Sequence, residues 1–312
     1  MKFASKISVV IPVYNNASDL AELSSRLEDT LDSHFSEYEV LFVNDGSRDD
    51  SLLLLKKLAQ LNDNIKVLNL SRNFGQHPAI CAGFENSTGD FVVLMDADLQ
   101  DNPEDIIKLY QKITLQECDV VYTIKLSDEK LFTSRVTSGL YHYVFSKIIG
   151  SNVPLNIGTF RMFNKLFLNE IKRYKEYNVL YGPLMFFMGF KSTFVTLEHH
   201  ERKHGKSAYT FSKRLKLAVN SLISYTDIPH KLSVYFGALV LFISFAYGAI
   251  VLSQYLFFGS QLPGGTTLVI FILSIMLGSF MLFLGIIGGY LFRVYQEVLA
   301  RPRYHIQEKV NL

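Results

Sequence analysis

The chain has 312 residues, 49% of them hydrophobic, and a formal net charge of +2. A charge this close to zero excludes the strongly basic proteins that bind nucleic acid through its phosphates. The length is enough for one large domain or two smaller ones, each with a sizeable core. The two cysteines, Cys81 and Cys118, match no metal-ligand spacing and no disulfide framework, which is typical of a reducing compartment.

Between residue 6 and about residue 123, short β-rich runs alternate with helical stretches. The first run, "KISVVIPV", contains Pro12 and is followed by no small-residue cleavage site, so it predicts a strand and not a signal peptide. Further strands are expected at "YEVLFVND", "IKVLNL", "DFVVLMDA" and "CDVVYTI", and helices at 17–33, 48–61 and 103–115. Strands that are apolar on both faces and alternate with helices predict a Rossmann-like α/β domain, with a mostly parallel sheet covered by helices on both faces.

Two long uncharged runs near the C-terminus predict a membrane anchor. Residues 232–258 and 266–292 contain no Asp, Glu, Lys or Arg. Each run is longer than the roughly 20 residues that a helix needs to cross a bilayer, which disfavours the alternative of two buried helices in a soluble protein. Glycines in both runs would allow close helix packing, either within one chain or in a homo-oligomer.

The segments that flank the two apolar runs are basic. The positive-inside rule therefore predicts that the domain formed by residues 1–209 and the tail formed by residues 293–312 both lie in the cytoplasm. Residues 210–231 combine an apolar helical stripe with lysine and arginine, which predicts an interfacial helix at the lipid headgroups. A helix packed on the sheet domain is the alternative for this segment.

The fourth predicted strand runs directly into acidic residues. Residues two apart in an extended strand face the same way, so Asp96, Asp98 and Gln100 are expected on one side if the strand geometry continues. Carboxylate oxygens combined with ligand phosphates suit Mg²⁺ or Mn²⁺, although an Asp-x-Asp pair alone is a weak signal. Asp101 and Glu104 have a simpler role, because acidic residues near Pro103 favour the start of a helix.

Polar residues also follow the other predicted strands, at the edge of the sheet where ligands bind in such folds. Asp45 is one of them, and it lies at a strand end in "VNDGSRDDS". Its carboxylate could accept hydrogen bonds from a base or a ribose, or it could cap the helix predicted over 48–61. The motif leaves both roles open.

Several of these stretches together resemble one family. "SVVIPVYNN", "EVLFVNDGSRDDS", "SRNFGQ", "DADLQDNPE", "GKSAYT" and "YLFRVYQEVLARPRY", with the two apolar runs, resemble the family 2 glycosyltransferases of the GT-A fold. Within that family the chain is similar to the polyprenyl-phosphate glycosyltransferases, over nearly its whole length. The resemblance implies an inverting enzyme that moves a sugar from a nucleotide sugar, UDP-linked by default, to undecaprenyl phosphate at the cytoplasmic leaflet.

The resemblance also implies roles for individual residues. The nucleotide site would be lined by Pro12, Tyr14, Asn15 and Asp45. Asp96 would face the nucleotide sugar, and Asp98 with Gln100 would hold the Mg²⁺ or Mn²⁺ ion. The acceptor phosphate would be bound by Arg135 and Arg161, and a loop near the donor diphosphate would contribute Lys206, Ser207 and Tyr209.

The chain departs from the resembled pattern at two positions. Many relatives have an aspartate before the Phe-Arg pair, where this chain has Thr159, and a lysine directly after the loop serine, where it has Ala208. Threonine cannot accept a proton at neutral pH. A polyprenyl phosphate has a second pKa near 6, so it is already largely ionised and needs no general base. The departures leave open a sugar other than glucose.

Two other functions compete with this interpretation. A processive polysaccharide synthase of the same superfamily usually carries a Gln-x-x-Arg-Trp motif and more membrane spans, whereas this chain has no Trp. A non-catalytic membrane adaptor or flippase subunit is the second alternative, and it would not need the acidic residues. A transport role would also need polar groups within the two apolar runs, which contain few of them.

Overall fold

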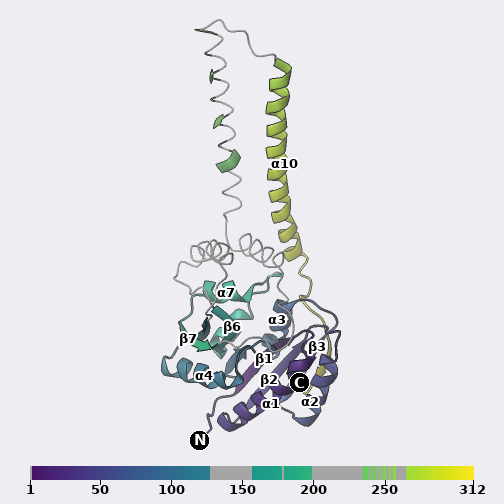
Figure 1. The fold of residues 1–312 in the computed structure, drawn as a ribbon, viewed down its shortest axis with the longest axis vertical. Coiled ribbons are helices and arrows are strands. Elements are labelled where there is room, and N and C mark those ends of the chain that lie inside the picture. The colour runs from purple at the N-terminus through teal and green to yellow at the C-terminus, as the bar shows by residue number, and fades with distance from the viewer. Residues whose placement is uncertain are drawn as a thin grey trace. The chain divides into compact units, whose positions relative to one another are not determined.

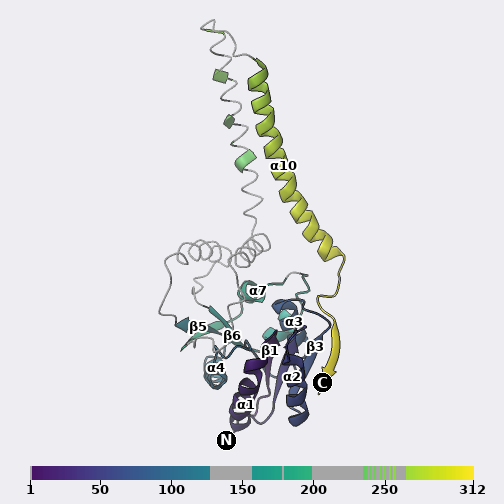
Figure 2. The ribbon, with the colours of Figure 1, turned by 45° about the vertical axis from the view of Figure 1, so that its right-hand side comes forward.

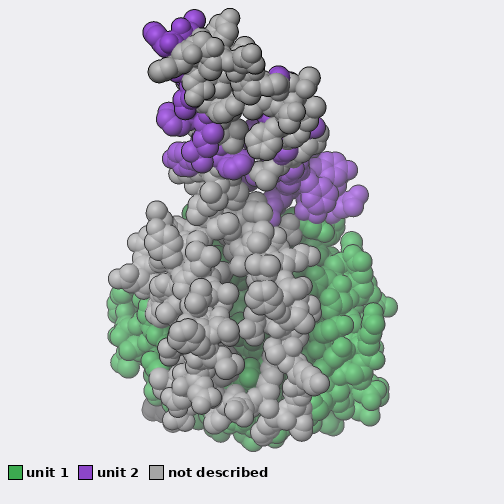
Figure 3. Space-filling model, turned by 45° about the horizontal axis from the view of Figure 1, so that its top comes forward, with its two compact units in different colours: residues 1–208, 302–312 green, residues 209–301 purple. Residues whose placement is uncertain are grey.

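The computed structural model describes residues 2–126, 157–177, 179–198 and 265–312, together with scattered residues between 235 and 257. The chain divides into two compact units, which Figure 3 shows in different colours. One unit comprises residues 1–208 and 302–312, and the other comprises residues 209–301. The C-terminal residues thus belong to the same unit as the N-terminal domain.

The first unit is built around a mixed sheet. In the described residues it has eight strands in the order β7-β5-β6-β4-β1-β2-β3-β8. Their bounds are Ile7–Val13 (β1), Tyr38–Asn44 (β2), Ile65–Leu70 (β3), Phe91–Leu94 (β4), Val120–Leu126 (β5), Ile157–Asn164 (β6), Ser192–Glu198 (β7) and Ile306–Val310 (β8). β1 to β4 are mutually parallel, β6 runs antiparallel to β4 and β5, and β8 runs antiparallel to β3.

β5 and β7 also pair in parallel, so among the described strands the prediction of a mostly parallel sheet fails only where β6 and β8 pair with their neighbours. Within the order β4-β1-β2-β3 every pairing is parallel. These strands are joined by helical crossovers, which is the connection that parallel neighbours require. Long connections precede β6 and β8, over residues 127–156 and 199–305. Such connections do not require the next strand to be parallel to its neighbour, so the outer part of the sheet is mixed.

Helices cover both faces of this sheet, as predicted (Figure 1). One face carries α1 (Ala17–His34), α2 (Ser51–Leu61), the short 3₁₀ turn Pro103–Asp105 and α4 (Ile106–Leu115). The other face carries α3 (Gln76–Asn86), α6 (Lys165–Ile171) and α7 (Tyr181–Phe187). α1, α2 and α4 correspond to the three predicted helices, whereas α3, α6 and α7 were not predicted.

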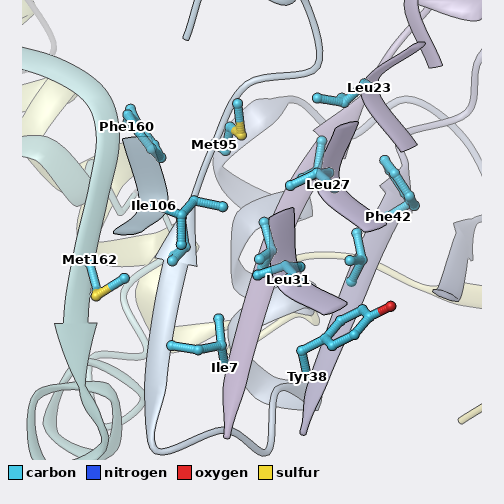
Figure 4. Packing of buried hydrophobic residues seen from close by; sticks show 14 of the residues in the cluster. Ile7, Leu23, Leu27, Leu31, Tyr38, Phe42, Met95, Ile106, Phe160 and Met162 are labelled. Carbon is cyan, nitrogen blue, oxygen red and sulfur yellow. The ribbon is translucent and has the colours of Figure 1, made fainter. Parts of the chain in front are cut away.

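The packing of α1 follows from the spacing of its leucines. Leu20, Leu23, Leu27 and Leu31 recur at helical intervals on one stripe, and all four are completely buried. They lie over β1 and β2, where Figure 4 shows Leu27 and Leu31 beside Ile7 and Phe42. Burying a leucine side chain contributes about 1.5–3 kcal/mol, so this stripe accounts for the position of α1.

β8 is the last strand of the chain and pairs with the outer edge of β3 (Figure 2). Side-chain contacts also stabilise this pairing. Lys56 of α2 forms an ion pair with Glu308 at 2.6 Å. The Asn311 side chain donates to the carbonyls of Ala59 and Ile65, at 2.7 and 2.9 Å. The sequence predicts only a basic tail over 293–312, whereas these residues continue a helix and then complete the sheet.

The second unit contains α10 (Gly265–Val298), a helix of 34 residues. The predicted span 266–292 lies within it. One helix of the described part is long and apolar enough to cross a membrane, over Ile275–Val298 with a mean hydropathy of 2.1. The predicted span 232–258 and the predicted interfacial helix 210–231 fall largely or wholly outside the described residues.

Candidate active site

The loops after β1 and β2 are joined by hydrogen bonds. Asn15 has a positive φ of 54°, its main-chain N–H donates to Oγ of Ser47 at 3.0 Å, and its side-chain Oδ1 accepts from the Arg48 N–H at 2.8 Å. Pro12 lies partly buried near the end of β1, and Tyr14 just beyond it is 43% exposed. The three residues predicted to line a nucleotide site are therefore neighbours at the carboxyl edge of the sheet, with the Tyr14 ring open to solvent.

Asp45 fixes the loop that follows β3. Its carboxylate is 3% exposed and accepts hydrogen bonds from the main-chain N–H groups of Phe74 at 2.7 Å and Gly75 at 2.9 Å. Burial raises the pKa of Asp45, and the two N–H donors oppose that rise because they favour the charged form. These bonds go to the β3–α3 loop and not to α2, so Asp45 does not act as the cap of the predicted helix 48–61.

Gly46 allows this close approach of the two loops. Its φ is +61°, and a Cβ atom there would lie 2.4 Å from the carbonyl carbon of Arg72 and 2.4 Å from the main-chain nitrogen of Asn73. Any side chain would separate the loops, so glycine is required both for its backbone conformation and for its size.

Asp96 is held between two elements that are distant in sequence. Its Oδ1 accepts a hydrogen bond from Nε2 of Gln76, the first residue of α3, at 2.9 Å. Its Oδ2 accepts from Oγ1 of Thr159, in β6, at 2.5 Å. The register of β4 and β6, with Leu94 opposite Arg161, places Thr159 opposite Asp96 when it is continued. The contact to residue 159 is thus a consequence of strand pairing.

Asp98 and Gln100 do not lie on a continuing strand. β4 ends at Leu94, and Leu99 has a positive φ of 55°, so the expected alternation of residues 96, 98 and 100 fails. Instead the main-chain N–H of Gln100 donates to Oδ1 of Asp98 at 3.3 Å, and Asp98 is 8% exposed. The Asp98 carboxylate therefore accepts a hydrogen bond from within its own turn.

The described residues contain no group of three or more His, Cys, Asp or Glu side chains that could hold a metal ion by themselves. A hard divalent cation of the Mg²⁺ type usually takes one or two carboxylates from the protein and completes its shell with phosphate and water oxygens. The Asp98 carboxylate, a hard oxygen donor at the carboxyl edge of the sheet, suits such an ion.

Arg161 is a buried cation near Asp96. It is 5% exposed, and its guanidinium donates to the carbonyls of Thr159 at 2.9 Å and Gly158 at 3.0 Å. Burial lowers its pKa, while the charges of Tyr122 and Asp96 act in the opposite direction. Among the described residues it forms no ion pair, so its positive charge is balanced only in part by the nearby Asp96 carboxylate.

His77 was not predicted from the sequence and lies in the first turn of α3, next to Gln76. Burial, with a smaller contribution from the charge of Arg161, lowers its pKa to about 4, so the imidazole is neutral at physiological pH. Its ring lies 6.0 Å from that of Tyr181 in α7. The only sequence signal for this residue was its position beside the "SRNFGQ" motif.

The structure thus connects Asp45, Asp96 and Arg161 of the predicted site through the β3–α3 loop and β6, with Gln76, His77 and Thr159 added to them. Asp98 lies two residues after Asp96, and the bond described for it comes from its own turn. Arg135, Lys206, Ser207 and Tyr209 lie outside the described residues. Chemically, the edge offers carboxylates for a metal ion or for hydroxyl groups and a buried guanidinium for an anion.

Two solved structures share this architecture. Glucosyl-3-phosphoglycerate synthase from Mycobacterium tuberculosis superposes with a TM-score of 0.50 at 16% identity, covering 70% of this chain and 78% of that one. Mannosyl-3-phosphoglycerate synthase from Rubrobacter xylanophilus has a TM-score of 0.50 at 15% identity, over 73% of this chain and 75% of that one. At these identities the likeness shows the fold alone, which is a GT-A-like α/β fold with a mixed sheet.

Sequence relatives extend over almost the whole chain. An uncharacterized glycosyltransferase of Bacillus subtilis, YkcC, is 34% identical over 306 residues, which cover 98% of this chain and 94% of the relative. The undecaprenyl-phosphate 4-deoxy-4-formamido-L-arabinose transferase of Klebsiella pneumoniae is 31% identical over 308 residues, with the same coverage of 98% and 94%. Residues 8–172 match the glycosyl transferase family 2 profile. The chain therefore belongs to glycosyl transferase family 2, and it is a glycosyltransferase.

Proposed function

We propose that the protein transfers a sugar from a nucleotide sugar, by default a UDP-sugar, to a polyprenyl phosphate at the cytoplasmic leaflet, with inversion at the anomeric carbon. The observation that carries this proposal is the pairing of β4 with β6. This pairing supports it because Asp96, the first residue of the acidic pair Asp96 and Asp98, interacts electrostatically with the buried cation Arg161. Transfer to a phosphate needs both, because the donor leaves as a diphosphate and the acceptor arrives as an anion.

The acidic pair supports binding of the donor. Asp98, together with Gln100, would hold a divalent ion, Mg²⁺ or Mn²⁺, and Asp96 would face the sugar of the nucleotide. Such an ion, when bound, neutralises charge on the departing nucleoside diphosphate. Pro12, Tyr14, Asn15 and Asp45 would line the nucleotide end of the site, since they lie at the same edge of the sheet.

The buried guanidinium supports binding of the acceptor. Arginine can form paired hydrogen bonds to a phosphate, and burial strengthens that interaction. We assign the acceptor phosphate to Arg161 together with Arg135, and the donor diphosphate also to Lys206, Ser207 and Tyr209. A phosphate monoester is already ionised at neutral pH, so Thr159 has no proton to accept. Direct attack by the phosphate oxygen on the anomeric carbon inverts its configuration.

The relative from Klebsiella pneumoniae supports the choice of a lipid acceptor, because its name states an undecaprenyl-phosphate substrate and it aligns with 98% of this chain. The chain's own topology supports a membrane anchor with two spans. β7 precedes residues 209–301 and β8 follows them, and both are strands of one sheet. One folded sheet lies on one side of a membrane, so the segment between them crosses it an even number of times.

The test is a transfer assay on membranes that contain the full chain. Radiolabelled nucleotide sugars are supplied one at a time with undecaprenyl phosphate, and label that enters the organic phase identifies the donor. Replacing Asp98 with Asn is expected to lower the rate about 100-fold or more, as for loss of a group that stabilises developing charge. Chelation of divalent ions by EDTA is expected to have the same effect.

Asp90→Asn is the matched control, because it removes the same charge at the opposite end of β4, where the Asp90 carboxylate accepts from the Lys6 N–H at 3.1 Å. It is expected to transfer at the wild-type rate. A chain without turnover on any donor would support the adaptor or flippase subunit instead. A product that grows by many sugars per lipid would support the processive synthase.

A further inference from the structure

Thr159 stands between the anion and the cation of the site. Its hydroxyl donates to Oδ2 of Asp96 at 2.5 Å, which is the short distance typical of a hydrogen bond to an ionised carboxylate. Its main-chain carbonyl accepts from Nε of Arg161 at 2.9 Å. One residue of β6 therefore contacts both charged groups that the proposed function uses.

Gln76 approaches the same carboxylate from another direction. It begins α3 and donates from Nε2 to Oδ1 of Asp96 at 2.9 Å. The loop before it is fixed in turn by Asp45, whose two oxygens accept the N–H groups of Phe74 and Gly75. The position of Gln76 thus depends on the end of β2, although it acts on the end of β4.

Two donors on different oxygens restrain a carboxylate more than either does alone. A single hydrogen bond leaves the carboxylate free to turn about its last side-chain bond, whereas a donor on each oxygen defines its plane. Both donors here are neutral, so neither compensates the negative charge by an ion pair. The two donors therefore restrain the carboxylate without adding a charge to it.

We propose that Gln76 and Thr159 are positioning residues that hold the Asp96 carboxylate in the orientation required for sugar transfer. This inference rests on the proposed function, and it assigns a role to the position where many relatives carry an aspartate. In this chain the side chain of residue 159 is a hydrogen-bond donor to the acidic pair and not a proton acceptor.

The experiment compares three variants of the full chain in the transfer assay. Thr159→Val keeps the shape of the side chain and removes the hydroxyl, and it is expected to lower kcat/KM for the nucleotide sugar by about 10- to 100-fold, the range for a lost hydrogen bond to a charged group. Thr159→Ser keeps the hydroxyl and is expected to stay within about threefold of wild type. Gln76→Met is expected to resemble Thr159→Val.

Thr123→Val is the matched control. Thr123 lies on the neighbouring strand β5, is 1% exposed, and donates its hydroxyl to the main-chain carbonyl of Phe160 at 2.7 Å. Its replacement removes a buried hydroxyl from the same part of the sheet without touching Asp96. If Thr159→Val transfers as well as Thr123→Val, or if Thr159→Ser fails to restore transfer, the positioning role is wrong.

A second measurement does not depend on turnover. The loss in unfolding temperature caused by Thr159→Val is expected to shrink by at least half when Asp96 is already alanine. The bond between the two side chains is absent from that background, so the second replacement cannot remove it again. The loss caused by Thr123→Val is expected to be equal in both backgrounds. If Thr159→Val lowers the unfolding temperature equally with and without the Asp96 side chain, the inference is overturned. If the wild-type protein transfers no sugar, only the proposed function is refuted.

Discussion

Gly46 illustrates how one residue shapes the carboxyl edge of the sheet. Its φ of +61° and the 2.4 Å distance from a Cβ atom to the backbone of Arg72 and Asn73 are two separate constraints. The sequence predicts a tight turn at "NDG" but not the second constraint, because the β3–α3 loop arrives from 26 residues further along the chain. The partners of Asp45, Phe74 and Gly75, lie in the same distant loop, so the sequence did not predict them either.

Replacement of Gly46 by Ala is expected to destabilise the fold by about 3 kcal/mol, combining the left-handed backbone with a steric clash. Gly189→Ala is the matched control, since Gly189 also has a positive φ, +68°, but a Cβ atom added there would meet no atom of the described residues within 4 Å. That variant is expected to lose about 1 kcal/mol. Thermal unfolding followed by circular dichroism measures both, and equal losses would contradict the clash.

Glu39 is a buried carboxylate at the other end of the sheet, far from the carboxyl edge. It is 1% exposed and accepts hydrogen bonds from Ser8 Oγ at 2.6 Å, Thr88 N at 2.7 Å and Lys66 Nζ at 2.6 Å. Burial alone would raise its pKa, but these donors outweigh burial and lower it below the ordinary value of 4.5. The network therefore stabilises the fold only while Glu39 is ionised.

We expect Glu39→Gln to cost about 3 kcal/mol at neutral pH, because it leaves a partly buried lysine without its charge partner. Since the pKa of Glu39 is lowered in the folded state, its contribution is present above pH 4.5 and is lost as the pH falls through the folded pKa. The difference in unfolding temperature between variant and wild type should shrink accordingly. The exposed pair Lys56–Glu308 provides the control, where Glu308→Gln should cost under about 1 kcal/mol.

At the scale of elements, the sequence predicts the segments whose pattern is local. β1 to β5 and α1, α2 and α4 carry either continuous apolar runs or one apolar stripe. α3 was missed because six consecutive residues, Ala79 to Phe84, are buried, which removes the amphipathic period. It also contains Pro78 and Gly83, and a Cβ atom on Gly83 would lie 2.2 Å from Val10 Cγ1, so glycine serves close packing on β1.

β8 was missed for a different reason. "IQEKV" is a polar edge strand, and only its pairing with β3 makes it a strand. Its partner lies more than two hundred residues earlier, so no local window contains the signal. The site also depends on distant segments. Asp96 and Asp98 were predicted as a pair from adjacent positions, but Gln76 and Thr159 became neighbours of Asp96 only through α3 and β6.

Removal of residues 304–312 is expected to expose the outer edge of β3. Hydrogen exchange should accelerate at the β3 amides that face β8, which lie in the register Val67 to Val310 and Asn69 to Glu308. Peptides from β7, at the opposite edge, serve as the internal control. Asn311→Ala, which removes two bonds to main-chain carbonyls, is a milder variant with the same expected direction. Unchanged exchange in β3 would contradict the role of β8.

At the scale of the whole molecule, the two-span proposal can be tested through the cysteines. Cys81 and Cys118 are both buried, so a new surface cysteine is the main target for a membrane-impermeant maleimide. Ser260→Cys, in the connector "GSQLPGGT", is expected to react in intact cells. Gln60→Cys, on the exposed surface of α2, should react only after the cells are lysed. Reaction of both in intact cells, or of neither, would contradict the proposed topology.

The position of β8 after residues 209–301 has a consequence for biosynthesis. A polypeptide is made from its N-terminus, and early domains usually fold as they emerge. Here the sheet keeps an open edge at β3 until the ribosome has synthesised residues 209–301 and β8 has emerged. An open edge is prone to pair with other chains, so a nascent molecule stalled before β8 is an aggregation hazard. The complete sheet can therefore form only after translation of the hydrophobic region has ended.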